Sequence, residues 1–390
     1  MKISTAIKSI GLGLVLAATG TARGKEAPEP AASPRPRIEA VFVLDTTGSM
    51  RGLIKAAQEK IWSIASTLCQ ARPAPELEIG LVGYRDRGDQ YVTRVTQLSS
   101  DLDRVYADLM AFQAQGGGDS PESVNQALHE AVTGIGWSQD NSTYRVIFLV
   151  GDCPPHMDYQ DDVRYPESCR LAAEQGIVVN TIQCGSHGPT TPIWAEIASL
   201  GSGVFFQVEQ SGGAVEAATP YDVKLADLSR QLDSTRVFYG TAEVRESQEE
   251  RVALAGRIYA EAPAAAVAQR AVFNESESGK CNFLGIKELV NDLADGTVSL
   301  AEVNDDELPS PLRTMEPAER AAYLNEKAEE RGRLQEQIRD LSKKRQDYIR
   351  EEIVRRAGAG ASSSLDHQLY AAISAQAAVK GIKCEGGPVY

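Results

Sequence analysis

The strongest constraint on the fold is an alternation of short apolar runs with amphipathic helical segments. Segments that we predict as strands lie at 38–44, 77–81, 91–98, 144–150, 177–182 and 204–208. Some of them, such as 38–44, are mostly apolar runs that are typical of buried strands. Between them, apolar residues recur at helical spacing, as Ile54, Ile61 and Leu68 do. Strands that alternate with helices form βαβ units around a mainly parallel sheet. We therefore predict a doubly wound, mainly parallel α/β domain over residues 38–236.

The chain after residue 236 changes character and is rich in alanine and glutamate. We predict a mixed, mostly helical region over 237–312, which ends in a loop at 304–312, then a long charged helix over 313–357 and a tail over 358–390. The long helix carries several acid–base pairs at i,i+4 spacing, which stabilise a solvated helix. Its apolar stripe allows two arrangements: packing against its own domain, or a coiled coil that joins two chains through residues 316–356.

The N-terminus has the features of an export signal. Lys2 and Lys8 precede a short apolar run, Ile10–Ala18, which is too short to cross a bilayer. We predict a signal peptide over 1–22 and a Pro-rich linker over 23–37, hence a periplasmic or secreted protein. The alternative is a retained membrane anchor. No later stretch is long and apolar enough to predict a membrane span in the mature chain.

The charge balance excludes some classes of partner. The chain carries 54 acidic and 40 basic residues, a formal net charge of −14. Such a chain repels phosphate groups, so we expect neither nucleic-acid binding nor a general affinity for anionic membranes. An acidic chain is compatible with cation binding.

Oxygen-bearing side chains follow the predicted strands. Asp45, Thr47 and Ser49 alternate directly after the first strand, Glu122 follows a run of three glycines, and Asp152 follows the strand at 144–150. In open α/β sheets, ligands bind outside the carboxyl ends of the strands. Carboxylate and hydroxyl oxygens suit Mg²⁺, Ca²⁺ or Mn²⁺ better than Zn²⁺.

These segments, DTTGSM, GGGDSPE and VIFLVGD, resemble a von Willebrand factor A (VWA) domain with a metal-ion-dependent adhesion site (MIDAS). The resemblance covers about residues 38–236. It implies that Asp45, Thr47, Ser49, Glu122 and Asp152 hold the metal, with Thr47 replacing the first serine of the family pattern. The DSPE loop is similar to the version in integrin β subunits, where Glu stands in for Thr.

The same integrin resemblance implies a possible second metal on Asp86 and Asp119. The alternative is that Asp119 only orders its loop. Another auxiliary site of that family needs acidic residues just after the first motif. Met50, Arg51 and Gly52 occupy those positions, so we expect that site to be absent.

The resemblance implies protein binding, in which an Asp or Glu of a partner completes the metal coordination. The protein partner itself is unidentified. We expect no catalysis, because His156 is a loop residue and Cys153 adjoins a carboxylate cluster that disfavours a thiolate. The alternatives are a metal-dependent hydrolase, or a scaffold in which the metal is structural.

The six cysteines are even in number, and export permits disulfides. Cys169 and Cys184 are expected near the same edge of the sheet, which makes them the preferred pair. A Cys281–Cys384 bond is the second candidate. Sequence alone leaves fifteen connectivities open.

Overall fold

The computed structural model describes residues 35–118, 120–210, 218–357, 365–384 and 387. The predicted signal peptide, most of the predicted linker and the break at 358–364 lie outside these described residues.

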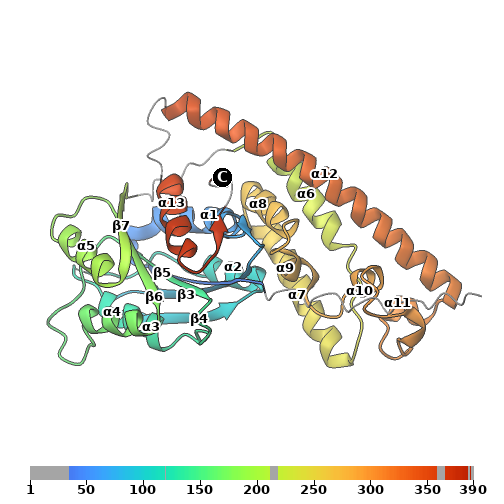
Figure 1. The fold of residues 1–390 in the computed structure, drawn as a ribbon, viewed down its shortest axis with the longest axis horizontal. Helices are drawn as coiled ribbons and strands as arrows, with labels where there is room; N and C mark the ends of the chain where they lie inside the picture. Colours follow the sequence, from blue (N-terminus) through green and yellow to red (C-terminus); the bar gives the residue numbers. More distant parts are fainter. Residues whose placement is uncertain (1–34, 119, 211–217, 358–364, 385–386, 388–390) are drawn as a thin grey trace, which may run out of the picture. The chain divides into compact units, whose positions relative to one another are not determined.

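The core of the first half of the chain is a six-stranded sheet (Figure 1). Four neighbouring pairs are parallel, and β4 joins one edge antiparallel to β3. This confirms the predicted mainly parallel sheet. In spatial order, the strands are β4 (Thr93–Ser99), β3 (Glu76–Tyr84), β1 (Arg37–Asp45), β5 (Tyr144–Gly151), β6 (Ile177–Cys184) and β7 (Ser202–Val208).

Helices cover both faces of the sheet, as the doubly wound prediction requires (Figure 1). One face packs against α3 (Val124–Thr133), α4 (Tyr165–Glu174) and α5 (Thr190–Leu200). The other packs against α1 (Arg51–Leu68) and α2 (Leu102–Met110).

The alternation within β1 explains the two layers. Successive side chains of a strand point to opposite faces. Phe42 and Leu44 belong to the core beneath α1, whereas Val41 and Val43 belong to the core beneath α3. Because both faces are buried, the strand is a continuous apolar run that ends at Asp45.

The second half of the chain is helical, in agreement with the prediction. Two helical elements fall where we expected a loop and a tail: α11 begins inside 304–312, and α13 lies inside 358–390. The elements are α6 (Asp222–Asp233), α7 (Ala242–Glu261), α8 (Ala264–Asn274), α9 (Lys280–Leu284), α10 (Leu289–Ala294), α11 (Ser310–Arg313), α12 (Pro317–Ala357) and α13 (Leu365–Ala378). A two-residue strand, β8 (Lys383–Cys384), pairs with β2 (Ala71–Arg72).

The helical part and the sheet share a core. Val267 and Phe273 of α8, and Leu369 and Ile373 of α13, are buried in the apolar cluster that α1 forms with the sheet. The described residues from Arg35 onward form one contact unit.

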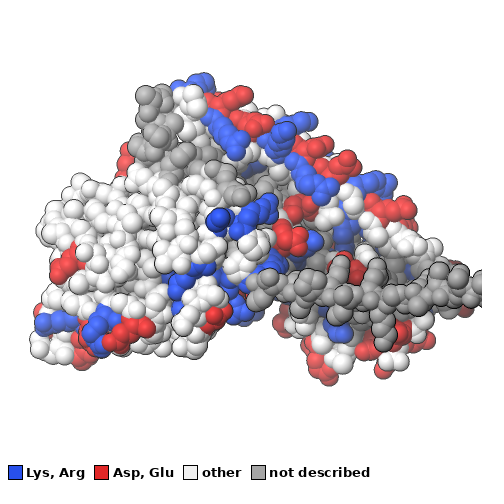
Figure 2. Space-filling view, viewed as in Figure 1, with Lys and Arg blue, Asp and Glu red and all other residues white. Residues whose placement is uncertain are grey.

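The long helix α12 packs against its own chain. Leu334 and Ile338 are buried against α6 and α8. Arg345, which interrupts the apolar stripe in sequence, is buried, and its Nε donates to Asp222 at 2.7 Å. Charges of both signs alternate along the exposed side of this helix (Figure 2). This supports intrachain packing, while self-association stays a prediction.

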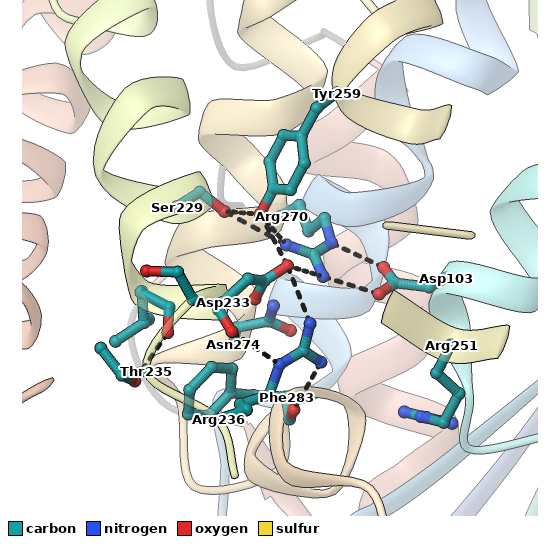
Figure 3. A network of polar contacts seen from close by, with 12 residues as sticks. Asp103, Ser229, Asp233, Thr235, Arg236, Arg251, Tyr259, Arg270, Asn274 and Phe283 are labelled. Carbon is teal, nitrogen blue, oxygen red and sulfur yellow. Dashed lines mark hydrogen bonds and ion pairs between the residues drawn. The ribbon is translucent and has the colours of Figure 1, made fainter. Parts of the chain in front are cut away.

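A buried polar network joins α2 to the helical part (Figure 3). Arg270 of α8 donates to Asp103 of α2 and to Asp233 of α6. The hydroxyl of Tyr259 accepts from Arg270 at 2.7 Å and donates to Asp233 at 2.8 Å. Asp233 also forms an ion pair with Arg236 at 3.2 Å, so two buried carboxylates face two guanidinium groups.

The predicted disulfides are wrong for this structure. All six cysteines are free. Cys169 lies in the core beneath α4, whereas Cys184 faces the core on the other side of the sheet. Cys184 ends β6, whereas Cys169 lies in the middle of α4, and the sheet separates their thiols. Cys281 is exposed and Cys384 is partly buried in β8, and they are not bonded either.

Within the described residues, no helix has an apolar stretch of the length and hydropathy needed to cross a membrane.

Candidate metal centre

Two strand ends place the first two carboxylates. Asp45 is the last residue of β1, and Asp152 follows the last residue of β5. β1 and β5 are parallel neighbours with Leu44 opposite Val150, so the two aspartates leave the sheet side by side. Glu122 reaches the same edge from the loop before α3, where it bridges to Pro155.

The loop after β1 is organised around one oxygen of Asp45. The backbone N–H and the Oγ1 hydroxyl of Thr47 both donate to Asp45 Oδ1, at 2.8 and 2.7 Å. Thr47 Oγ1 lies 3.2 Å from Oγ of Ser49, which is exposed. The alternating residues predicted from sequence are thus in mutual contact.

Each of the three carboxylates has one buried oxygen that has no hydrogen-bond partner among the described residues. These atoms are Asp45 Oδ2, Glu122 Oε2 and Asp152 Oδ1. Unpaired buried carboxylate oxygens are unfavourable, because nothing in the protein replaces the lost hydration.

The pKa values of the carboxyl groups show that their ionised forms are disfavoured. Burial raises the pKa of Asp45 to about 7, and the charge on Asp152 adds to the shift. Burial raises the pKa of Glu122 to about 9, with further contributions from Asp45 and other nearby carboxylates. Both shifts disfavour the ionised carboxylates, as expected where several acidic groups are buried close together.

The glycine run before Glu122 makes room for the cluster. A Cβ on Gly117 would lie 2.9 Å from Cβ of Thr47 and 3.0 Å from Oε1 of Glu122. Gly117 also has a φ of +70°, which favours glycine. The run therefore allows the loop to lie between Thr47 and Glu122.

The residues fit a hard divalent cation by donor chemistry. The donors are carboxylate and hydroxyl oxygens, and three carboxylates each have an unpaired oxygen. Within the described residues, no group of three or more His, Cys, Asp or Glu side chains is arranged so that it could hold a metal ion. Asp45, Glu122 and Asp152 therefore do not form a complete set of ligands by themselves, and the predicted set also includes the hydroxyls of Thr47 and Ser49.

Asp86 is engaged by protein groups. It accepts hydrogen bonds from the hydroxyls of Ser123, at 2.8 Å, and Tyr159, at 3.1 Å, and lies 3.4 Å from Nε2 of His156. Asp119 lies outside the described residues. A second metal on Asp86 and Asp119 thus stays a prediction.

His156, which we expected in a loop, has a buried side chain. Its ring stacks on Tyr159 with centroids 4.0 Å apart, and Nδ1 lies 2.8 Å from Asp158. Burial raises the pKa of Cys153 to about 12, and the charge on Asp152 adds to this effect. The thiol is therefore protonated at neutral pH, which disfavours a nucleophilic role.

Three residues at the centre were not predicted. Tyr84 ends β3 opposite Asp45, and burial followed by the charges on Asp45 and Asp152 raises its pKa. Asp89 accepts from the backbone N–H of Gly117 at 3.0 Å. Gln210 donates from Nε2 to Asp152 Oδ2 at 2.7 Å. Tyr84 and Gln210 could have been found from sequence, because both lie at or just after the carboxyl ends of strands, where ligands bind in such sheets.

The fold and the acidic strand ends agree with the resemblance to a VWA domain. Residues 39–191 match the family model described as von Willebrand factor A domain. This supports the resemblance for that part of the chain.

Relatives of known sequence or structure cover only parts of the chain. An ariadne-like RING finger protein of Acanthamoeba polyphaga mimivirus is 21% identical over 207 residues, 48% of this chain and 20% of the relative. The chain thus spans about a fifth of that relative.

Solved structures are similar over slightly less than half of the chain. Proximal thread matrix protein 1 from the mussel byssus is 13% identical over 45% of this chain and 43% of that chain, with a TM-score of 0.36. Another of its structures is described with a zinc-occupied MIDAS motif. The SpRpn10 VWA domain is 12% identical over 45% of this chain and 89% of that chain, with a TM-score of 0.35. The pilus adhesin SpaC of Lactobacillus rhamnosus GG is 12% identical over 46% of this chain and 28% of that chain, with a TM-score of 0.36.

Proposed function

We propose that this protein is a divalent-cation-dependent protein-binding module. Asp45, Thr47, Ser49, Glu122 and Asp152 would hold the cation, with Mg²⁺ the first candidate and Ca²⁺ or Mn²⁺ the alternatives. The observation that carries the proposal is the set of three buried carboxylates, each with an unpaired oxygen, at one edge of the sheet.

The electrostatic argument is one of compensation. Burial and mutual repulsion disfavour the ionised forms of Asp45 and Glu122. A bound cation would favour those ionised forms and offset the repulsion. A cluster of apolar or fully hydrogen-bonded side chains would gain no such stabilisation from a cation.

The edge of the centre is accessible. Gly48, Ser49 and the glycines at 116–118 are exposed, whereas the three carboxylates beneath them are buried. A cation held there would offer a Lewis-acid position to an oxygen ligand of a partner. We therefore propose that a partner protein presents an Asp or Glu side chain at this edge.

We propose no catalytic role. A hydrolase needs a nucleophile or an activated water, a base and an oriented second shell. Cys153 is held as a thiol, and the imidazole of His156 is placed between Asp86 and Asp158. A scaffold with a structural metal is the remaining alternative, and loss of partner binding on metal removal would argue against it.

We propose that the protein acts outside the cytoplasm. The support is the sequence of residues 1–22, with two lysines before a short apolar run. The partner is then an exported or surface protein.

The test is capture of partners from the exported fraction by immobilised protein, in Mg²⁺ and in chelator. Wild type should retain a defined set of proteins in Mg²⁺ only, and Asp45→Ala should retain none of them. Asp140→Ala is the matched control, because Asp140 is exposed in the loop that precedes β5, away from the carboxyl edge. Equal capture by wild type and Asp45→Ala would contradict the proposal.

A further inference from the structure

We propose that Gln210 is a positioning residue of the candidate metal centre, and that it orients the carboxylate of Asp152 toward the cation. This inference rests on the proposed function. Gln210 lies in the loop after β7 and does not belong to the predicted set of metal ligands.

The first observation is a hydrogen bond to a predicted ligand. Nε2 of Gln210 donates to Oδ2 of Asp152 at 2.7 Å. The other oxygen, Oδ1, is buried and has no hydrogen-bond partner among the described residues. The amide thus engages one oxygen and leaves the other for the cluster that contains Asp45 and Glu122.

The second observation is that the side chain of Gln210 is held by contacts with neighbouring loops. Gly185, at the end of β6, has a φ of +78°, and a Cβ there would lie 2.2 Å from Oε1 of Gln210. Nε2 of Gln210 also lies 3.9 Å from the sulfur of Met50, which is fully buried in the turn after Ser49. Gln210 therefore contacts the loops after β1, β5 and β6.

The chemistry of the amide suits this role. It donates a hydrogen bond without adding charge, so Asp152 keeps the negative charge that a cation needs. A lysine or arginine at this position would compete with the cation for that charge. Groups that orient metal ligands in this way typically change metal affinity by about 10- to 100-fold when they are removed.

The chain supplies a matched control. Gln207 lies on β7, and its Nε2 donates to the backbone carbonyl of Gly185 at 2.9 Å. It is an exposed glutamine beside the same glycine, but its hydrogen bond goes to the backbone and not to Asp152. Replacement by methionine removes the donor at either position and keeps a side chain of similar length.

The experiment is Mg²⁺ titration by calorimetry on the full chain, with melting in chelator measured in parallel. Gln210→Met should bind Mg²⁺ about tenfold more weakly than wild type. Gln207→Met should bind like wild type. The two variants should melt at the same temperature as each other in chelator, because each loses one hydrogen bond of an exposed glutamine.

Several outcomes would overturn the inference. If Gln210→Met binds Mg²⁺ as tightly as wild type, the amide does not orient Asp152. If it binds more tightly, the amide competes with the cation. If Gln210→Met melts at a lower temperature than Gln207→Met in chelator, Gln210 is a structural residue. In each case Mg²⁺ binding by wild type leaves the proposed function intact, whereas no binding by wild type refutes both.

Discussion

Arg270 is completely buried and donates from Nε and Nη2 to the two carboxylate oxygens of Asp103, both at 2.6 Å. The two residues are 167 positions apart, and the bond ties the helical part of the chain to α2. The helical part is therefore a component of the same fold, and the face of the sheet beneath α1 is shared with α8.

Removal of this guanidinium should strongly destabilise the protein. Arg270→Met leaves the carboxylate of Asp103 buried without its guanidinium partner, which costs about 3–5 kcal/mol in comparable cases. Asp233 keeps its contacts with Arg236 and Tyr259. Urea unfolding measures the loss. Arg170→Met is the control, because Arg170 pairs with Glu167 and Glu174 on an exposed helix face and should leave stability unchanged. Equal midpoints for both variants would contradict the interpretation.

The stability of the metal-free protein should fall as pH rises. Burial raises the pKa of Asp45 to about 7 and that of Glu122 to about 9, from ordinary values of 3.8 and 4.5. Between the ordinary and the raised pKa of each group, the folded chain holds a proton that the unfolded chain has released. The free energy of unfolding therefore decreases as the pH rises through this range. Urea unfolding in chelator at about pH 5, 7 and 9 tests this.

Glu122→Gln is the variant that isolates the effect. Glutamine has no proton to lose, so the variant should lose less stability than wild type over the alkaline half of that range. Parallel pH profiles for the two proteins would show that Glu122 does not titrate in the folded state as described.

The thiols should react in the order of their exposure. Iodoacetamide should modify exposed Cys281 in the native protein. Burial raises the pKa of Cys69 and of Cys169 to about 12, so these should react only after unfolding. Mass spectrometry of non-reduced peptides reads the result, and a Cys169–Cys184 cross-link would contradict the structure.

The apolar face of α12 should contribute to stability within one chain. Ile338→Ala should lower the free energy of unfolding by about 2–5 kcal/mol, because Ile338 is fully buried. Val354→Ala is the control on the same helix, since Val354 is 64% exposed. Sedimentation should show the same mass for both variants. A smaller mass for Ile338→Ala would indicate that this face joins two chains.

The parts that could be predicted from sequence depend on local pattern. Strand β1 is a run of apolar residues with an aspartate at its end, and such a run specifies both the strand and the edge where Asp45 lies. The same rule placed Asp152. Helix periodicity likewise located α12, whose composition differs from that of its neighbours.

The rest depends on contacts between distant residues. Whether a cysteine faces one side of the sheet or the other follows from strand register and helix packing, so local pattern could not indicate that Cys169 and Cys184 face opposite sides. The partner of Arg270 is 167 residues away, and no local pattern indicates it. Gln210 contacts Asp152 because a loop returns to the same edge after β7.

Metal titration tests the central claim most directly. Mg²⁺ is titrated by calorimetry into wild type, Asp152→Ala and Asp140→Ala, and melting is followed with and without Mg²⁺. We predict one site on wild type and Asp140→Ala, with a dissociation constant in the micromolar to millimolar range that oxygen-ligated sites span. Stability should increase by about 2.7 kcal/mol at one hundred times the dissociation constant. Asp152→Ala should show neither binding nor the increase. Equal heats from wild type and Asp152→Ala, or none from wild type, would contradict the assignment of a cation site to this edge of the sheet.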